Sequence, residues 1–435
     1  MKIRFYLLCT FMIAVILNLP GTAGADQKPS EKARIIHEKI LTIDTHTDTP
    51  MMLEIPAFDI GRKNNPRERG GKVDFPRMKE GGLDSVFFAV FVGQGERTPE
   101  GNKNAREEAL AQFALIKKAV SDYPELAELA LRSSDAVKIE AKGKRAVYIG
   151  IENGYPVGNS IQNVRMFYDL GARYITLCHT RNNAICDSST DRKGEEHGGL
   201  SGFGKEVVME MNRLGMIIDV SHISDKSFYD VLALSAAPVI ASHSCARALC
   251  DNPRNLDDDM LKSLAAKGGV IQVCILSEYI KTPKPYPARD EALAKLRAEY
   301  TNYSKLSEEE KKKVREKWYA INRKFPPELA TVADAVDHID HIVKIAGIDH
   351  VGIGTDFDGG GALEDCYDSS ELWRITLELL KRGYSENDIQ KIWGGNFIRV
   401  FKAIEDKAGK DSGKNQAAQN TITGSFPGKH GLNCF

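Results

Sequence analysis

The chain has 435 residues, of which 42% are hydrophobic, so it is long enough to bury a large core. Its 59 lysine and arginine residues nearly balance its 60 aspartate and glutamate residues, which leaves a formal net charge of -1. This balance gives no electrostatic reason to expect a nucleic acid or an anionic membrane surface as partner.

The first 25 residues have the pattern of a signal peptide. Lys2 and Arg4 precede an uncharged run over residues 5–19, and the small residues at 23–25 fit the site that signal peptidase cleaves. We expect cleavage after Ala25 and export to the periplasm or the medium, with no membrane span in the mature chain. A retained anchor is the alternative, although the run is short for a bilayer span. Seven cysteines stay in the mature chain, an odd number, so at least one is unpaired or pairs between chains.

From residue 41 onwards, short β-branched runs alternate with amphipathic stretches. Strands are predicted at 41–44, 85–92, 146–151, 174–178, 216–220, 239–242, 270–275 and 351–354. Helices are predicted at 105–120, 161–170, 205–214, 225–234, 257–266 and 333–346. Eight strands that are mostly separated by helices predict an α/β fold, the (β/α)8 TIM-like barrel, rather than an open doubly wound sheet. The sequence has no Gly-x-Gly-x-x-Gly after an early strand, which argues against dinucleotide binding.

We predict one barrel domain over residues 26–406, with a charged helical insertion at about 281–327. The insertion opens with prolines and becomes charged and helical from Asp290 to Lys324. Its run of three glutamates and three lysines fits a solvated face. Its position after the seventh strand also fits a helical flap on the rim where barrel active sites lie. Residues 407–435 are polar and rich in Gly, Lys and Asn, so we expect a largely disordered tail.

Histidines and acids fall where the predicted strands end. His46 and Asp48 follow the first strand, and residues two apart on an extended backbone share a face, so they can bind one ion together. Glu152 ends the third strand, His222 the fifth and His243 the sixth. Barrels assemble their active sites at the carboxyl ends of strands, so we expect these five residues to converge. Nitrogen and oxygen ligands without cysteine are typical of catalytic zinc, and five suit two ions with Glu152 as the bridge.

Two further residues fit around such a metal centre. His179 ends the fourth strand and would place a neutral imidazole beside the metals. Asp356 ends the eighth strand, where it can exchange protons with a metal-bound water, whereas Asp358 fits better as a turn or cap residue. The other histidines are interpreted as surface, loop or helix residues: His37, His197, His338, His341, His350 and His430.

The segments that carry these residues resemble the membrane dipeptidase family, also called renal dipeptidase, of the metallo-dependent hydrolase superfamily. The similarity spans about residues 35–405 in the family's order. It includes 44–48 (DTHTD), 150–152 (GIE), 171–179 (GARYITLCH), 218–222 (IDVSH), 238–244 (PVIASHS), 254–255 (RN) and 354–359 (GTDFDG).

The resemblance implies a zinc-dependent dipeptidase in which a water or hydroxide between two zinc ions attacks the peptide bond of a dipeptide. His46 and Asp48 would hold one zinc ion, His222 and His243 the other, and Glu152 would bridge them. A homodimer is left open. The long insertion departs from shorter members of the family, so the preferred dipeptides do not follow from the resemblance.

The resemblance also implies the residues that bind the substrate. It assigns His179 to the substrate carbonyl and the developing oxyanion, and Arg254 to the free carboxylate. Asp356 matches the acid near the amino end that also handles protons, and Tyr279 matches an aromatic residue lining the pocket. The lipid anchor found at the carboxyl terminus of some members is not expected, because residues 407–435 lack a terminal apolar tail.

Two alternatives stay open at this point. Another metal-dependent amidohydrolase, such as a deacylase, deaminase or lactonase, would often carry a carbamylated lysine at the end of the fourth strand, where this chain has Cys178 and His179. A non-catalytic zinc-binding barrel would be expected to have lost at least one of its metal ligands, or His179, or Asp356. All of these residues are present.

Overall fold

The computed structural model describes residues 28–69, 71–301 and 306–408. The predicted signal peptide lies outside these residues, as does the predicted tail apart from residues 407 and 408, which are helical. Within the described ranges, no helix combines the length and the hydropathy that a membrane span requires. Six of the seven cysteines that follow the predicted signal peptide lie in these ranges and are buried free thiols, whereas Cys434 lies outside.

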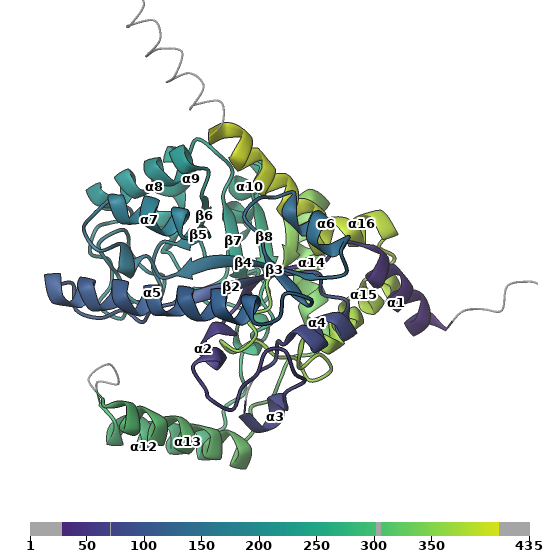
Figure 1. Ribbon diagram of the computed structural model, residues 1–435, viewed down its shortest axis with the longest axis horizontal. Coiled ribbons are helices and arrows are strands. Elements are labelled where there is room, and N and C mark those ends of the chain that lie inside the picture. The colour runs from purple at the N-terminus through teal and green to yellow at the C-terminus, as the bar shows by residue number, and fades with distance from the viewer. Residues whose placement is uncertain (1–27, 70, 302–305, 409–435) are drawn as a thin grey trace, which may run out of the picture.

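Parallel strands form a ring at the centre of the molecule (Figure 1). They are β1 (Ile43–Thr47), β2 (Ser85–Phe91), β4 (Arg145–Glu152), β5 (Ala172–Thr176), β6 (Ile217–Asp219), β7 (Ile240–Ser244), β8 (Val270–Val273) and β9 (Val351–Ile353). Each pairs in parallel with the next. The ring closes where the Asp356 N–H donates to the His46 carbonyl at 3.0 Å and the Asp48 N–H donates to the Phe357 carbonyl at 2.8 Å. The predicted (β/α)8 barrel is therefore confirmed.

The strands differ from the prediction in two respects. A further short strand, β3 (Ala127–Leu129), pairs with β4 and was not predicted, since three residues carry no alternating pattern. Strand β1 extends to Thr47 because Thr47 pairs with Phe88 after an irregular step in the register. His46 consequently lies within β1 rather than just beyond it, and His243 lies within β7, which extends to Ser244.

Helices surround the strands (Figure 1). The predicted ones are all present, as α5 (Pro99–Ser121), α7 (Gln162–Asp169), α8 (Gly202–Leu214), α9 (Asp225–Leu234), α10 (Asp258–Ala266) and α14 (Val332–Ala346). Five of these begin at a Ser, Thr or Asp whose side chain accepts a backbone N–H of the first turn, which stabilises the start of a helix. These residues are Thr98, Ser201, Ser224, Asp257 and Thr331.

Further helices that were not predicted complete the outer layer and the loops. They are α1 (Pro29–Lys39), α2 (Pro50–Leu53), α3 (Pro66–Arg69), α4 (Phe75–Gly81), α6 (Asp135–Glu140), α11 (Ser277–Ile280), α15 (Trp373–Lys381) and α16 (Glu386–Gln390). A π-helical segment, Lys391–Gly395, leads into the helical residues 396–408.

The inside of the barrel is filled below its carboxyl end. The ring of Phe87 stacks on Tyr148 and Tyr174, with centroids 4.8 Å and 5.2 Å apart, and Phe397 packs edgewise against Phe87 from the helical segment that follows the barrel. A second, larger core lies between the strands and the surrounding helices. Because aromatic rings fill the interior, only the carboxyl end of the ring is open to chemistry.

The charged insertion forms two helices, α12 (Pro287–Glu299) and α13 (Glu308–Lys324). They pack against each other and project from the barrel near α2 and α3 (Figure 1). Their base is attached to the barrel rim through Ser277, whose hydroxyl accepts the Ala330 N–H at 2.9 Å and donates to the Ala362 carbonyl at 3.0 Å. The insertion therefore begins and ends beside the open end of the barrel.

Candidate active site

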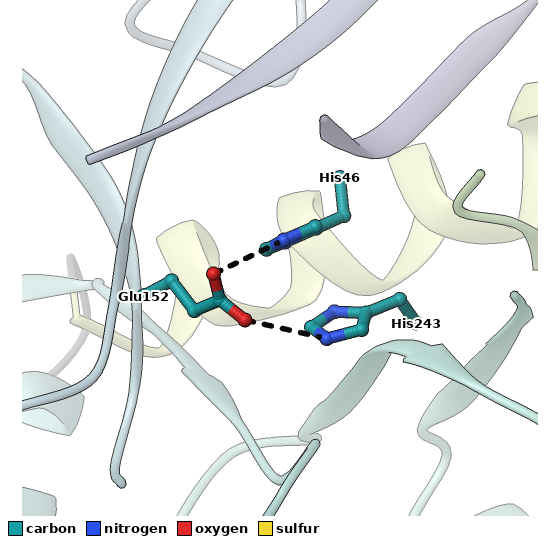
Figure 2. A group of neighbouring side chains, drawn as sticks. All are labelled: His46, Glu152 and His243. Carbon is teal, nitrogen blue, oxygen red and sulfur yellow. Dashed lines mark ion pairs between the residues drawn. The ribbon is translucent and has the colours of Figure 1, made fainter. Parts of the chain in front are cut away.

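The structure brings the five predicted metal ligands together at the carboxyl end of the barrel. Glu152 lies among them. Its Oε2 is 3.6 Å from His46 Nε2, and its Oε1 is 3.1 Å from His222 Nε2 and 3.5 Å from His243 Nε2. Asp48 Oδ2 lies 3.9 Å from His46 Nε2. Figure 2 shows the carboxylate of Glu152 with one oxygen towards His46 and the other towards His243.

Unusual backbone conformations occur where the strands end. Asn153, His222 and Asp356 have φ values of 73°, 71° and 59°, in the left-handed region that non-glycine residues rarely adopt. Such conformations cost on the order of 1–3 kcal/mol each and cluster at active sites, where surrounding contacts enforce them. His222 and Asp356 adopt this conformation three residues after short strands that end at Asp219 and Ile353.

His179 lies beside Glu152 on the same end of the barrel. Its Nε2 is 3.5 Å from Glu152 Oε1, and the Phe91 ring contacts its imidazole edgewise at 4.8 Å. Burial lowers the pKa of His179, so the imidazole is neutral at neutral pH, as predicted from its position.

Arg254 and Tyr279 form one wall of the site. The Arg254 side chain is buried, its Nη2 donates to the His243 carbonyl at 3.1 Å, and its guanidinium lies 5.1 Å from the centre of the Tyr279 ring. Its Nε has no hydrogen-bond partner among the described residues. A buried guanidinium with a free N–H suits a carboxylate acceptor.

The two acids after β9 point to different places. Asp356 is buried beside the ligands, and burial raises its pKa to about 6. Asp358 accepts the Thr49 hydroxyl at 2.9 Å and the backbone N–H groups of Gly71 and Lys72 at 3.1 and 2.8 Å. It therefore joins the loop after β9 to the loop after β1, which is a structural role.

The residues present fit a metal ion. His46 Nε2 and Asp48 Oδ1 are buried and, within the described part of the chain, have no hydrogen-bond partner. Leaving such an atom unsatisfied costs about 1–3 kcal/mol. Two ligands of a tetrahedral zinc ion lie about 3.3 Å apart, given bonds of about 2.0–2.1 Å. The observed ligand-atom distances, from 2.8 Å between His222 Nε2 and His243 Nε2 up to 3.9 Å between His46 Nε2 and Asp48 Oδ2, bracket this value.

More than one grouping of these ligands is compatible with an ion. The side chains of His46, Glu152 and His243 form one compact set, those of Glu152, His179 and His222 a second, and those of His46, Asp48 and Asp356 a third. His46 and His243 share a set because their ring centroids lie 3.8 Å apart. Proximity alone therefore does not divide these residues into separate metal sites.

Comparison with known proteins identifies the chain. The family model of membrane dipeptidase (peptidase family M19) matches residues 30–415. The chain belongs to the membrane dipeptidase family. Because the family match covers most of the chain, it favours the predicted metal-dependent dipeptide hydrolase over the deacylase, lactonase and non-catalytic alternatives.

Individual relatives of this dipeptidase agree with the family match. The chain is 32% identical over 377 residues to dipeptidase tcpJ of Claviceps purpurea, covering 85% of this chain and 78% of that protein. It is 30% identical over 399 residues to dipeptidase 3 of Rattus norvegicus, covering 90% of this chain and 70% of that protein. The crystal structure of the probable dipeptidase PvdM from Pseudomonas aeruginosa is similar, with a TM-score of 0.76 and 30% identity, covering 88% of this chain and 100% of that chain.

Carboxylates and imidazoles influence each other's ionisation in this dipeptidase. Burial by itself would raise the pKa of Glu152, but the neighbouring imidazoles of His46, His179 and His222 together outweigh burial and hold this pKa well below its usual range. Burial and the negative charge of Glu152 raise the pKa of Asp48 well above its usual value. Burial lowers the pKa values of His222 and His243, so both imidazoles are neutral, the form that binds a metal.

Sequence reasoning missed the residues behind the ligands of the dipeptidase. The Tyr174 hydroxyl lies 2.8 Å from His46 Nδ1, and Ser242 Oγ lies 2.8 Å from His243 Nδ1. Asp44 accepts the backbone N–H of Thr355 at 2.8 Å, which holds the loop after β9 against β1. One signal was available, because Asp44 is an acid inside an otherwise uncharged buried strand.

Proposed function

We propose that this dipeptidase holds two zinc ions and cleaves the peptide bond of dipeptides that carry a free carboxylate. The observation that carries the proposal is the position of Glu152. Its two oxygens face different ligands, with Oε2 towards His46 and Oε1 towards His222 and His243. A carboxylate in this position can bridge two cations with one oxygen on each.

The proposed ligand sets follow from this bridge. His46 and Asp48 would hold one ion, His222 and His243 the other, and Glu152 would contribute to both. Bound zinc supplies Lewis acidity, which polarises the substrate carbonyl and activates a water at neutral pH. These ligand side chains are buried at the carboxyl end of the barrel, where they would hold the pair of ions.

His179 and Asp356 supply the proton chemistry. The neutral imidazole of His179 would donate a hydrogen bond to the carbonyl oxygen of the substrate, where negative charge develops in the transition state. Asp356 would accept the proton of the attacking water as the C–O bond forms and the carbonyl oxygen gains charge. It would then deliver this proton to the departing amine as the amide C–N bond breaks. Its raised pKa, to about 6, suits a carboxyl that gains and loses a proton in each cycle.

Arg254 would select for short substrates. Its buried guanidinium can bind the free carboxylate of the second residue through two parallel N–H donors, and the Tyr279 ring holds its plane. A clamp for the free carboxylate beside the predicted ligand His243 would favour a substrate whose carboxylate is one residue beyond the scissile bond, which is a dipeptide.

The test is to count metal and compare substrates with one preparation. Protein purified without a chelator should contain about two zinc equivalents per chain and should cleave a dipeptide far better than the matching dipeptide amide or tripeptide. Full activity at one equivalent would contradict the bridged pair. Equal cleavage of the amide would contradict the carboxylate clamp and favour a broader amidohydrolase.

We also propose that the chain is exported, because residues 1–25 have the charge and apolar pattern of a signal peptide. Amino-terminal sequencing of the protein recovered outside the cytoplasm should then begin at Asp26. Recovery of the exported protein with its first 25 residues intact would contradict cleavage.

A further inference from the structure

His243 is the first of three buried side chains that are joined in a chain of hydrogen bonds. His243 Nδ1 is 2.8 Å from Ser242 Oγ, and the Ser242 hydroxyl donates to Asp219 Oδ2 at 2.7 Å. All three residues are at most 1% exposed. On the other side of its ring, His243 turns Nε2 towards Glu152 Oε1 at 3.5 Å. The imidazole is therefore connected to a carboxylate at its back and faces the metal centre at its front.

The hydrogen bonds of Asp219 fix the direction of this chain. Its Oδ1 accepts the backbone N–H groups of Ser221 at 3.0 Å and Ser242 at 2.8 Å, and its Oδ2 accepts the hydroxyls of Thr176 and Ser242 at 2.5 and 2.7 Å. A carboxylate offers about four acceptor positions, so all are filled by donors. The single hydrogen of the Ser242 hydroxyl is used towards Asp219, and its oxygen is left to accept a hydrogen from His243 Nδ1.

This direction decides which nitrogen of His243 can bind a metal. A neutral imidazole carries one hydrogen, and a hydrogen on Nδ1 leaves the lone pair on Nε2. Among the described residues, His222 Nδ1 has no hydrogen-bond partner, and His46 Nδ1 contacts the Tyr174 hydroxyl. Of these three predicted imidazole ligands, His243 is the one whose Nδ1 is linked through a serine to a buried carboxylate.

We propose that Asp219 is a positioning residue of the metal centre, which acts through Ser242 to fix the tautomer and the ring orientation of His243. The inference rests on the proposed role of His243 as a zinc ligand. Groups that orient a metal-binding imidazole raise its basicity, and their loss typically lowers metal affinity 10- to 100-fold. Asp219 also joins β5, β6 and β7, so a test must separate this positioning from general support of the barrel.

The chain offers a matched pair of variants. Ser242→Ala and Thr176→Val each remove one hydroxyl that donates to the same oxygen, Asp219 Oδ2. Only Ser242→Ala interrupts the connection to His243. The measurement is the zinc dissociation constant of the metal-free protein, by competition with a chromophoric chelator, together with the Tm of each metal-free variant.

Ser242→Ala should bind its weaker zinc equivalent roughly 10- to 100-fold less tightly than the wild type. Thr176→Val should stay within about threefold, with a similar metal-free Tm. Asp219→Asn should behave like Ser242→Ala, because its amide N–H would turn the serine hydroxyl towards His243 and place the imidazole hydrogen on Nε2. In the cobalt-loaded forms, the visible absorption spectrum should change in Ser242→Ala and Asp219→Asn but not in Thr176→Val, since ligand orientation sets that spectrum.

Two results would overturn this inference while leaving the proposed function intact. One is wild-type zinc affinity in Ser242→Ala. The other is an equal loss of affinity in Ser242→Ala and Thr176→Val, which would make Asp219 a general support of the strands. A wild-type protein that binds no zinc would instead overturn the proposed function, and the inference with it.

Discussion

Gly359 lies so close to Asp48 that a methyl group on its Cα would fall 1.9 Å from Asp48 Oδ2. The same methyl group would lie 2.3 Å from Asp356 Oδ1. The backbone of Gly359 is outside the left-handed region, so the requirement for glycine is steric rather than conformational. The loop after β9 can therefore bring Asp356 beside Asp48 only because position 359 has no side chain.

Gly359→Ala should separate these two carboxylates and inactivate the enzyme without unfolding it. Displacing catalytic groups by about 1 Å can lower the rate on the order of 100-fold, and we expect a fall in kcat/KM of at least that size. Gly93→Ala is the matched control, because no atom lies within 4 Å of the methyl group that it would add. The check is dipeptide hydrolysis with circular dichroism on both variants. Equal activity in the two would contradict the close approach.

Glu152→Gln should lose zinc and activity while the fold is retained. The substitution keeps the shape of the side chain but removes the negative charge that would hold two cations together. Glu152 ends β4 above the aromatic rings that fill the barrel, so its charge contributes little to the core. Elemental analysis and far-UV circular dichroism of the purified variant measure both effects. A variant with wild-type zinc content and activity would place the metal centre elsewhere.

Arg254→Ala should lower kcat/KM for a dipeptide by roughly 30-fold or more. Loss of one partner from a buried, hydrogen-bonded charge pair costs on the order of 2–5 kcal/mol, and about 1.4 kcal/mol corresponds to a factor of ten. Arg247→Ala is the control. Arg247 lies in the same loop region, and its guanidinium is paired with Asp225 at 2.6 Å, so its loss should leave kcat/KM nearly unchanged.

The dipeptide amide completes the test of Arg254. Without a carboxylate, the amide should be a poor substrate for the wild type and should lose little further when Arg254 is replaced by alanine. If the substitution lowers hydrolysis of the amide as much as that of the free acid, Arg254 supports the site without binding the substrate carboxylate.

His37 should make the stability of the protein depend on pH. It is buried on α1, its Nδ1 lies 2.8 Å from the Thr376 hydroxyl and its ring packs edgewise on Trp393. Burial lowers its pKa to about 3 from an ordinary 6.5. The unfolded chain therefore binds a proton that the folded chain does not. The stability from this group is fully present above about pH 6.5 and is lost as the pH falls towards 3.

His37→Gln should remove this contribution to the pH dependence. Between pH 7 and pH 5 the wild type should lose about 2 kcal/mol more of its free energy of unfolding than the variant. The measurement is urea unfolding of the metal-free proteins at both pH values, so that zinc release does not contribute. Parallel losses in the two proteins would show that His37 is protonated in the folded state.

Much of the barrel could be predicted from the sequence because its signals are local. The apolar runs at 85–92 and 146–151 correspond closely to β2 and β4, and residues 225–234 form α9 as predicted. The end of β1 was wrong by three residues, since Thr47 continues the strand only through its pairing with Phe88. The short strand β3 was missed for the same reason, because its pairing with β4 and not its composition makes it a strand.

The sequence by itself determined the fold class, the family and the set of residues that meet at the carboxyl end of the barrel. The periodicity of hydrophobic residues and the types of side chain at strand ends can be seen in short segments, and the order of these segments along the chain predicts the barrel. The barrel topology then brings the strand ends together. The tertiary structure alone decided that Glu152 turns its two oxygens to different histidines, that Asp219 backs His243 through Ser242, and that Gly359 must lack a side chain. These relationships join residues from different strands and loops. Their distances depend on how the closed ring packs around its aromatic core, which no local pattern encodes.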